Sequence, residues 1–229
     1  MIKLDPRLQL VADMVDKNCR LADIGTDHAY LPVYLLENNL ISSAIAADLR
    51  SGPLSHAEET VRVAGLEKQI ELRLSDGLDK FQAEEIDCVV MAGMGGILIT
   101  QIIDRAHWLC TDTKTLVLQP MTDAPLLRRY LAEHGFAIIA ERATGDAKHI
   151  YTVIKARYGS EPFRPTALQA LVGLLNQPLG EFEKRYLKKE QASLSKQMNG
   201  LAVAGKDNEA AEIAKLYNEL TDLLGEKSL

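Results

Sequence analysis

The chain has 229 residues, of which 47% are hydrophobic and 25% are charged, and these values are those of a globular protein with room for one α/β domain and a smaller appendage. The formal net charge of −6 argues against indiscriminate nucleic-acid binding, so an RNA partner would require a local basic patch. No apolar run is long enough to span a bilayer and the first residues lack a signal h-region, so we expect no membrane partner. The three cysteines form no Cys-x-x-Cys pair, which argues against a metal site and favours a reducing cytoplasm.

The first predicted element is an amphipathic helix from Leu4 to Val15, which has Asp5-Pro6 as a start signal. This end of the chain is locally basic. The residues concerned are Lys3, Arg7, Lys17 and Arg20. We interpret them as a solvated helix face.

A strand at Arg20–Gly25, a tight turn and a helix at Tyr30–Glu37 follow. This is the arrangement that opens a nucleotide-binding βαβ unit. The dinucleotide fingerprint requires glycines at alternate positions, but Asp27 and Ala29 stand where the next two glycines would be. A carboxylate in this turn would repel a pyrophosphate, whereas it would accept a cationic centre such as the sulfonium of S-adenosylmethionine. The turn therefore favours S-adenosylmethionine over NAD.

Two further predicted strands, Ser43–Asp48 and Ile70–Ser75, end at or beside carboxylates. Asp48 lies about 20 residues after the first turn, where an acid meets ribose hydroxyls in such folds, although an acid there is also a common helix N-cap. Asp76 follows the next strand and is suited to accept a hydrogen bond from an adenine amino group, with the Gly77 backbone amide nearby; the alternative is a simple Asp-Gly turn. Carboxyl ends of parallel strands converge on one crevice, so we expect these groups to lie together.

The fourth predicted strand, Ile86–Met91, leads into the glycine-rich stretch Ala92–Gly96. Such a turn indicates close backbone approach by a ligand, or alternatively eases the packing of the next helix on the sheet. The remaining elements of this part are a helix at 51–63, a helix at 97–106, a strand at 115–119 and a helix at 124–133.

Two β segments, Phe136–Arg142 and His149–Lys155, are joined by a link too short for a crossover, so they form an antiparallel hairpin. Five βα units that end in this hairpin predict a Rossmann-like α/β fold with a seven-stranded sheet whose last strand is reversed. This is the sheet topology of class I methyltransferases and differs from that of ordinary dehydrogenases.

The proline-containing stretch Gly159–Pro165 predicts a boundary between a methyltransferase domain at 1–158 and a helical domain at 159–229. A short helix at 166–176 precedes two long helices with a turn at Gly205 to Asn208, which together predict a coiled-coil-like hairpin with Tyr186 and Tyr217 in its seam. The first arm has a cationic stretch, which is either a solvated face or an RNA-binding groove. Its residues are Lys184, Arg185, Lys188, Lys189 and Lys196.

Several stretches together resemble the bacterial tRNA (adenine-22-N1)-methyltransferases, and the likeness extends to the C-terminal helical hairpin. These stretches are Ala-Asp-Ile-Gly-Thr-Asp-His-Ala-Tyr-Leu-Pro at 22–32, Ala-Ile-Ala-Ala-Asp at 44–48 with Gly52-Pro53 following, Asp76-Gly77-Leu78, Ala92-Gly93-Met94-Gly95-Gly96, and Leu118-Gln119-Pro120. The resemblance implies a class I methyltransferase that uses S-adenosyl-L-methionine and acts on N1 of adenosine 22 in tRNA. We expect the helical domain to contact tRNA, with dimerisation as the alternative role.

The resemblance further implies which side chains bind the cofactor. They are Asp23, Gly25, Asp27 and His28 at its methionine end, Asp48 at the ribose, Asp76 and Gly77 at the adenine, and Gly93 and Met94 on the methyl-transfer side.

The chemistry of adenine N1 can be considered separately. N1 has a free lone pair and needs no general base, so catalysis consists of in-line positioning and stabilisation of positive charge on the base. A carboxylate such as Asp27 suits the second task. Methylation of the amino group uses a side-chain acceptor after the fourth strand, which the sequence Ala-Gly-Met-Gly lacks. N1 lies on the Watson–Crick edge, so the base must be unpaired, and Tyr30 and His28 are the candidates to stack on it.

Three other interpretations are open or disfavoured on the sequence. The chain could methylate another RNA site, or it could be a non-catalytic cofactor-binding scaffold that recruits partners through its helical hairpin. A nucleotide-dependent oxidoreductase is disfavoured by Asp27 and by the antiparallel hairpin. The oligomeric state is left open.

Overall fold

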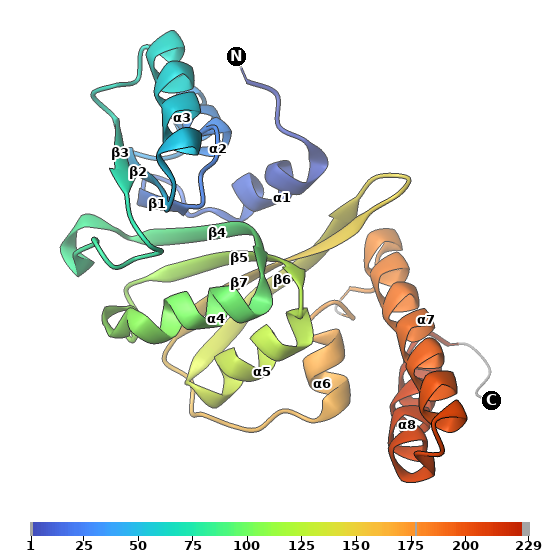
Figure 1. Cartoon of the computed structure of the whole chain (residues 1–229). Coiled ribbons are helices and arrows are strands. Elements are labelled where there is room, and N and C mark those ends of the chain that lie inside the picture. The colour runs from blue at the N-terminus through green and yellow to red at the C-terminus, as the bar shows by residue number, and fades with distance from the viewer. Residues whose placement is uncertain (1, 177, 226–229) are drawn as a thin grey trace.

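The computed structural model describes residues 2–176 and 178–225, and its larger part is a seven-stranded sheet covered by helices on both faces (Figure 1). The strands are β1 (Arg20–Ile24), β2 (Ser43–Asp48), β3 (Ile70–Leu74), β4 (Cys88–Gly95), β5 (Thr115–Thr122), β6 (Phe136–Gly145) and β7 (Ile150–Tyr158). The helices are α1 (Pro6–Met14), α2 (Tyr30–Glu37), α3 (Ser51–Ala64), α4 (Gly96–Arg105), α5 (Ala124–Glu133), α6 (Ala167–Val172), α7 (Glu181–Val203) and α8 (Asp207–Leu223). Two short 3-10 turns lie at Ala83–Glu85 and His107–Leu109.

The strand order is β3-β2-β1-β4-β5-β7-β6, and β7 runs antiparallel to both of its neighbours. The predicted sheet with a reversed last strand is therefore confirmed. The chain order changes direction between β1 and β4, which lie side by side and are parallel. Open α/β sheets form their ligand crevice at such a switch point, beyond the carboxyl ends of the strands.

The side chains of the central strands alternate between two hydrophobic cores, one on each face of the sheet. Leu21 of β1 packs with Val11, Val33 and Val61 from α1, α2 and α3, whereas its neighbour Ala22 packs on the other face with α4 and α5. Because both faces are covered, the central strands read as continuous apolar runs in the sequence.

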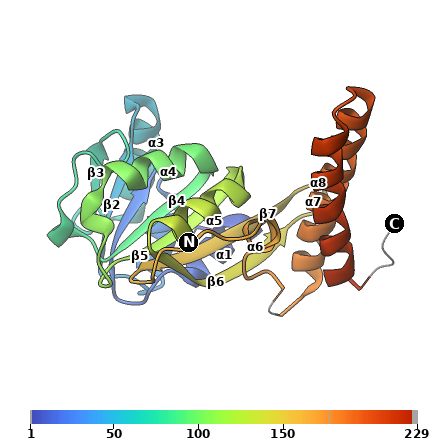
Figure 2. The ribbon, with the colours of Figure 1, turned by 90° about the horizontal axis from the view of Figure 1, so that it is seen from below.

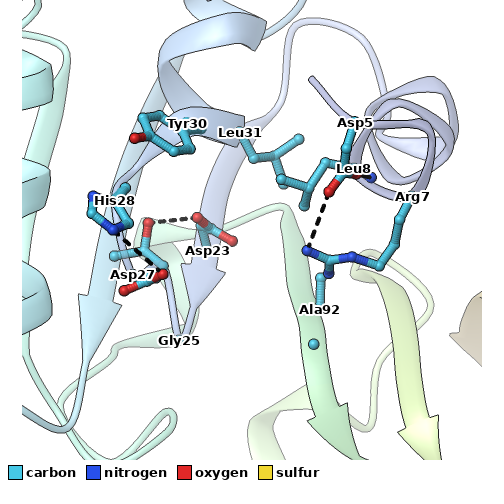
Figure 3. Close-up of a pocket in the computed structure, with 12 residues that line it drawn as sticks. Asp5, Arg7, Leu8, Asp23, Gly25, Asp27, His28, Tyr30, Leu31 and Ala92 are labelled. Atoms are coloured by element: carbon cyan, nitrogen blue, oxygen red, sulfur yellow. Dashed lines mark hydrogen bonds and ion pairs between the residues drawn. The ribbon is translucent and has the colours of Figure 1, made fainter. Parts of the chain in front are cut away.

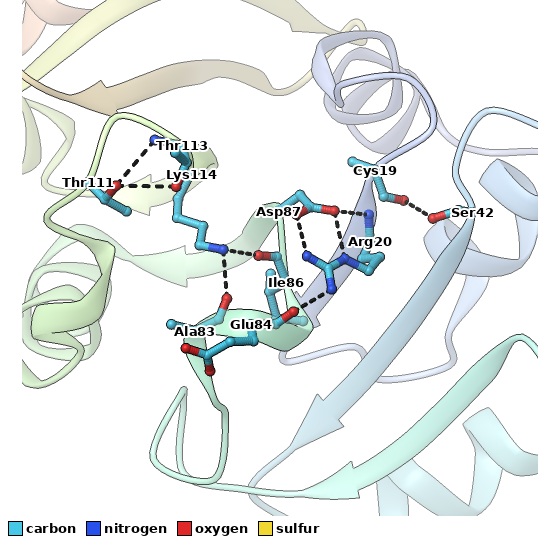
Figure 4. A network of polar contacts seen from close by, with 10 residues as sticks. All are labelled: Cys19, Arg20, Ser42, Ala83, Glu84, Ile86, Asp87, Thr111, Thr113 and Lys114. Atoms are coloured by element: carbon cyan, nitrogen blue, oxygen red, sulfur yellow. Dashed lines mark hydrogen bonds and ion pairs between the residues drawn. The ribbon is translucent and has the colours of Figure 1, made fainter.

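Ion pairs and hydrogen bonds close the sheet edge at the amino ends of β1, β4 and β5 (Figure 4). The Arg20 guanidinium donates to both carboxylate oxygens of Asp87, at 2.7 and 2.9 Å, and this partner lowers the pKa of Asp87 to about 2. Lys114 donates to the backbone carbonyls of Ala83 and Ile86. This edge is occupied by structural contacts, and the ligand crevice lies at the opposite edge.

The long helices α7 and α8 form an antiparallel hairpin at the β6–β7 end of the sheet (Figure 2). A third hydrophobic cluster joins them to the sheet, and Leu187, Leu194 and Leu220 are among its buried members. Tyr186 is buried in this cluster, and Tyr217 packs against it. Buried Glu183 of α7 accepts hydrogen bonds from the Ala143 backbone N–H at 3.0 Å and from Arg142 Nε at 3.1 Å. These bonds fix the base of the hairpin.

A buried ion pair joins α6 to the sheet as well. Arg128 of α5 donates to Glu141 of β6 at 2.9 Å and to the carbonyls of Ala170 and Leu171 at the end of α6. The predicted helix at 166–176 is shorter in the structure, since α6 ends at Val172. Gly173 follows with φ +58°, and a Cβ there would collide with the Glu141 carboxylate and the Arg128 side chain. The close approach of the chain to the ion pair thus ends the helix.

Strand β4 extends further at its carboxyl end than the sequence predicts. It begins at Cys88 and extends to Gly95, so part of the glycine-rich stretch pairs with the end of β5 instead of forming a turn directly after Met91. The pairing has two irregularities, at Ala92/Met94 and at Met94/Gly95. Glycine permits this irregular extension, because Gly93 has φ +81°.

Candidate active site

Two adjoining pockets of about 410 and 400 Å³ lie beyond the carboxyl ends of the strands, around the switch point between β1 and β4. They share a wall made by Gly25, Asp27, Ala92 and Gly93. The other residues of the first pocket are Asp5, Arg7, Leu8, Asp23, Thr26, His28, Tyr30 and Leu31 (Figure 3). The other residues of the second pocket are Ile24, Asp48, Leu49, Arg50, Ser75, Asp76, Gly77, Met94, Leu98 and Ile102. Every candidate site residue from the sequence therefore lines one of these two pockets or both.

The turn after β1 bends sharply because its residues take left-handed backbone conformations. Gly25, Asp27 and Ala29 have φ values of +73°, +52° and +55°. The backbone N–H groups of Gly25 and Thr26 both donate to the Ala47 carbonyl, at 2.8 and 3.0 Å, which holds the turn against β2. A Cβ at position 25 would meet the terminal methyl of Met94, so glycine there lets the two pocket walls approach. Aspartate tolerates the left-handed region better than most residues do, which suits Asp27 to this position.

Asp23 is a buried carboxylate that opens into the first pocket. The Asp23 side chain is 5% exposed, and it accepts a hydrogen bond of 2.6 Å from the Thr26 hydroxyl. Burial raises the pKa of Asp23 to about 6, with a contribution from the Asp48 charge, while the Thr26 hydrogen bond acts in the opposite direction. The described residues give this carboxylate a hydroxyl partner but no cationic one. A ligand ammonium group in the pocket would supply that charge.

Asp48 and Asp76 mark the second pocket. Asp48 is buried at the end of β2 and accepts a hydrogen bond of 2.9 Å from the Arg50 backbone N–H. Asp76 is exposed, and Arg105 of α4 donates to both of its carboxylate oxygens, at 3.0 and 3.2 Å. This partner lowers the pKa of Asp76. The position of Asp76 at this edge is predicted from the sequence, whereas its contact with Arg105 is not.

A stack of flat rings stands at the mouth of the first pocket. His28 lies between Tyr30, at a centroid distance of 5.1 Å, and His56 of α3, at 4.8 Å, and the three rings are nearly parallel. The His28 Nε2 atom lies 3.7 Å from a carboxylate oxygen of Asp27, which itself faces solvent (Figure 3). His28 and Tyr30 are the stacking candidates from the sequence. The sequence gives no signal for His56, whose place in the stack depends on the packing of α3 beside α2.

Sequence reasoning also misses two residues, Gln119 and Arg7, that hold the Gly93 side of the first pocket. The buried Gln119 side chain accepts hydrogen bonds from Arg7 of α1 at 2.9 Å and from the Gly93 backbone N–H at 3.0 Å. The interpretation of Arg7 as part of a solvated helix face is wrong, because Arg7 lines the first pocket (Figure 3). Its Nη2 atom lies 3.8 Å from a carboxylate oxygen of Asp5. The Leu-Gln-Pro stretch after the fifth strand is the available signal for Gln119.

The described residues contain no cluster of His, Cys, Asp and Glu arranged to hold a metal ion. Nor does any helix within 2–176 and 178–225 combine the length and apolarity needed to cross a bilayer.

Comparison with known proteins places this geometry in a family. A family model described as a methyltransferase domain matches residues 4–154. The tRNA (adenine(22)-N(1))-methyltransferase of Bacillus subtilis (strain 168) is 35% identical over 190 residues, which cover 82% of this chain and 80% of that protein.

Solved structures agree over nearly the whole chain. The B. subtilis m1A22 tRNA methyltransferase TrmK superposes with a TM-score of 0.86 at 30% identity and covers 96% of this chain and 99% of its own. TrmK of M. capricolum, solved with S-adenosyl-homocysteine, gives a TM-score of 0.81 at 28% identity and covers 97% and 98%. A Streptococcus pneumoniae protein solved with S-adenosyl-L-methionine gives 0.79 at 32% identity and covers 93% and 99%. On these matches, which include both the sheet and the helical hairpin, the chain belongs to the tRNA (adenine-22-N1)-methyltransferase family.

Proposed function

We propose that this protein transfers a methyl group from S-adenosyl-L-methionine to N1 of adenosine 22 in tRNA. One observation carries most of the proposal. A buried carboxylate without a cationic partner among the described residues, Asp23, faces a two-part pocket that continues past Gly25 and Gly93 to a second buried carboxylate, Asp48. An elongated ligand with an ammonium group at one end and vicinal hydroxyls further along would satisfy both carboxylates.

The chemistry of the pocket residues supports S-adenosylmethionine as the ligand. Asp23 would hold the amino group of the methionine part, and Asp48 would accept from the ribose hydroxyls. In the second pocket, Gly77 would present its backbone amide to the adenine ring, while Asp76 would accept from the adenine amino group with Arg105 fixing its carboxylate. Gly25, Gly93 and Met94 would form the wall beside the sulfur. When bound, the cofactor supplies a methyl group on a positively charged sulfur.

The chain's own contribution to the reaction is positioning and electrostatics. Asp27 lies on the wall shared by the two pockets, so its carboxylate would stabilise the positive charge that adenine acquires at N1. The stretch Ala92-Gly93-Met94-Gly95 has no side-chain oxygen or nitrogen that could accept a hydrogen bond from an exocyclic amino group. This supports the ring nitrogen as the nucleophile. The exposed Tyr30 ring, backed by His28 in the ring stack, would stack on the extruded base and exclude water from it.

Residues 159–229 form the tRNA-contacting domain in this proposal, appended to a catalytic domain at 1–158. The cationic first arm of the hairpin supports this assignment, since Lys184, Arg185 and Lys188 all lie on it. A tRNA-modifying enzyme would act in the cytoplasm.

The test is radiolabelled methyl transfer to two tRNA transcripts that differ only in having adenosine or guanosine at position 22. We expect incorporation into the adenosine transcript alone, recovered as 1-methyladenosine. Incorporation into both transcripts would contradict the site but keep the activity. Binding of the cofactor without any incorporation would favour another substrate or a non-catalytic scaffold.

A further inference from the structure

A third cleft lies at the same edge of the sheet as the two pockets. It has a volume of about 200 Å³ and is formed by the end of β5, the start of β7 and one face of α7. Because β7 is antiparallel to β5, the chain enters β7 at the edge where β5 ends. The lining of the cleft includes Met121, Asp123, Tyr151, Tyr186, Lys189 and Glu190.

The cleft is connected to the catalytic pockets by the paired ends of β4 and β5. Gly95 pairs with Thr122, and a Cβ on Gly96 would collide with the Asp123 carbonyl. Neighbouring strands lie about 4.8 Å apart, so the pockets at β1 and β4 are separated from the cleft at β5 and β7 by roughly 10 Å. A nucleotide close to an extruded base in an unstacked RNA strand can reach across such a distance.

Apolar side chains of the cleft and of the first turn of α4 are suited to bases. Met121 at the end of β5 and Ile97 in the first turn of α4 are large apolar side chains with exposed fractions of 47% and 49%. Ile97 directly follows the Gly95–Gly96 pair that touches β5. A base can lay an apolar ring face on side chains of this kind, whereas a phosphate gains nothing from them.

The cleft itself combines groups that suit the edge and face of one base. Tyr151 is half-buried, and the Lys189 ammonium lies over the Tyr186 ring, 5.8 Å from its centroid. Glu190 is also half-buried, and burial raises its pKa. Carboxyl groups at positions 123 and 190 disfavour a phosphate in the cleft and suit the amino group of a base. Pockets for drug-sized ligands usually exceed about 300 Å³, so this volume suits a single ring system.

The cleft is held open by contacts that do not involve its lining. Glu183, one helical turn before the cleft residues of α7, is bonded to the Ala143 backbone of β6. Arg185 donates to the Asp146 carbonyl in the turn between β6 and β7 at 2.7 Å. Both walls are therefore positioned before any ligand binds, which lowers the entropic cost of binding.

We propose that this cleft binds a second base of the tRNA, one that leaves the stack near the target adenosine. The proposal rests on the proposed function, since it assigns a further part of the tRNA to the same catalytic edge. It makes the helical hairpin part of the recognition of unpaired bases, in addition to any contact with phosphates.

The experiment combines protein variants with tRNA substitutions. Lys189→Ala and Tyr151→Ala change side chains of the cleft without removing a contact of Gln119, and the controls are Lys68→Ala, which lies before β3 at the opposite edge, and Ile139→Ala on β6. Each protein is tested for tRNA affinity by fluorescence anisotropy and for methyl transfer at saturating cofactor. The tRNAs carry a single abasic nucleotide at each position within three of the target.

We expect each cleft variant to weaken tRNA binding and to raise KM about tenfold, with kcat within about twofold of wild type. One abasic position should have the same effect on the wild-type protein and little further effect on the cleft variants. The proposal would be overturned if the control variants lost as much tRNA affinity as the cleft variants. It would also be overturned if the cleft substitution and the abasic nucleotide reduced affinity independently at every position tested. Wild-type protein that binds tRNA without methylating it would contradict the proposed function, and the affinities would still decide whether the cleft binds a base.

Discussion

Asp27 is the residue whose charge matters most to the proposed chemistry. Asp27→Ala is expected to abolish transfer and to leave the fold intact, but alanine tolerates the φ of +52° less well than aspartate does. Asp27→Asn keeps a side chain that accepts this backbone conformation and removes only the charge. We expect at least a 100-fold loss of the single-turnover rate, comparable to removing one electrostatic stabiliser elsewhere. The melting temperature should stay within a few degrees of wild type.

Asp123 offers a comparison for Asp27, because it too has a left-handed backbone, with φ +57°, and lies at the same sheet edge. Asp123→Asn should leave the single-turnover rate of a saturated complex within a fewfold of wild type. A near-wild-type rate for Asp27→Asn would remove the electrostatic role.

Asp23 links the cofactor pocket to stability. Burial raises the pKa of Asp23 to about 6 from 3.8, so the folded protein holds a proton that the unfolded chain has released between these values. The stability from protonated Asp23 is therefore present below pH 3.8 and is lost as the pH rises through about 6. In the absence of cofactor, Asp23→Asn should raise the free energy of unfolding at pH 7.5 by up to about 3 kcal/mol, which corresponds to this pKa difference.

Urea denaturation of wild type and Asp23→Asn at about pH 7.5 and near pH 4 tests this expectation. The gain in the free energy of unfolding should shrink at the lower pH. The variant should bind S-adenosylmethionine more weakly at the higher pH, because the carboxylate that pairs with the cofactor's ammonium group is lost. An equal gain at both pH values would show that ionisation of Asp23 is not its cause.

The candidate site is predictable from the sequence where it depends on chain order. Carboxylates at or just beyond the carboxyl ends of neighbouring parallel strands must meet at one edge, so the order of the elements is enough to group Asp23, Asp48 and Asp76. Arg7, Arg105 and His56 escape this argument, because each reaches the site from a helix and its position depends on how that helix packs.

Among the elements, helix α6 depends most clearly on a single interaction. The Arg128–Glu141 pair is buried, and Glu141 also accepts hydrogen bonds from the Thr152 hydroxyl and the Leu174 backbone N–H, both at 2.9 Å. Removing one member of a buried pair leaves the other charge without compensation, which costs about 3–5 kcal/mol. Glu141→Leu should lower the free energy of unfolding by this amount.

A double-mutant cycle separates the pair from its surroundings. Arg128→Met combined with Glu141→Leu should be less destabilising than the sum of the two single changes, since neither charge is then left alone. Additive losses in urea denaturation would mean that the two side chains act independently.

The element boundaries show where sequence reasoning has its limit. Helices α2 and α5 and strand β2 begin and end where the apolar pattern and flanking residues predict. Helix α6 ends early because Gly173 must approach the buried ion pair, and β4 runs on because β5 is beside it to pair with. Both differences come from partners distant in the chain, which local propensity does not contain.

For the whole molecule, the main question is what the helical hairpin adds. Deleting Phe163–Leu229 should weaken tRNA binding more than cofactor binding, but it also removes the backbone partners of Arg128 and so affects stability. A shorter hairpin avoids this problem. Removing residues 197–203 and 209–215 deletes seven residues from each arm, which preserves the seam, and it keeps the Gln191–Thr221 hydrogen bond nearer the base.

The shortened protein should melt as one unit and bind S-adenosylmethionine as the full chain does, while its dissociation constant for tRNA rises at least fivefold. Isothermal titration with cofactor and anisotropy with tRNA measure the two effects. An unchanged tRNA affinity would assign the outer part of the hairpin to another role, such as self-association.

The fold as a whole is predictable because its pattern is regular. Alternating strands and helices with a final short β link admit few topologies once crossovers are right-handed, and the sheet follows from that rule. The placement of the hairpin against β6 and β7 is not predictable in this way, since it depends on the tertiary contacts of Glu183 and of the cluster around Leu187.

The hydrogen bonds of Gln119 have a consequence for the order in which the protein assembles. Arg7 and Gln119 are 112 positions apart, and the Asp16–Lys155 contact, which ties the other end of α1 to the sheet, spans 139. Contacts of such separation form late, because the intervening chain must first be ordered. On the ribosome, the wall at Gly93 therefore cannot close before most of the sheet has been synthesised. The ligand pocket thus requires the chain up to Gln119, and its occupancy should report that synthesis and folding have passed this point.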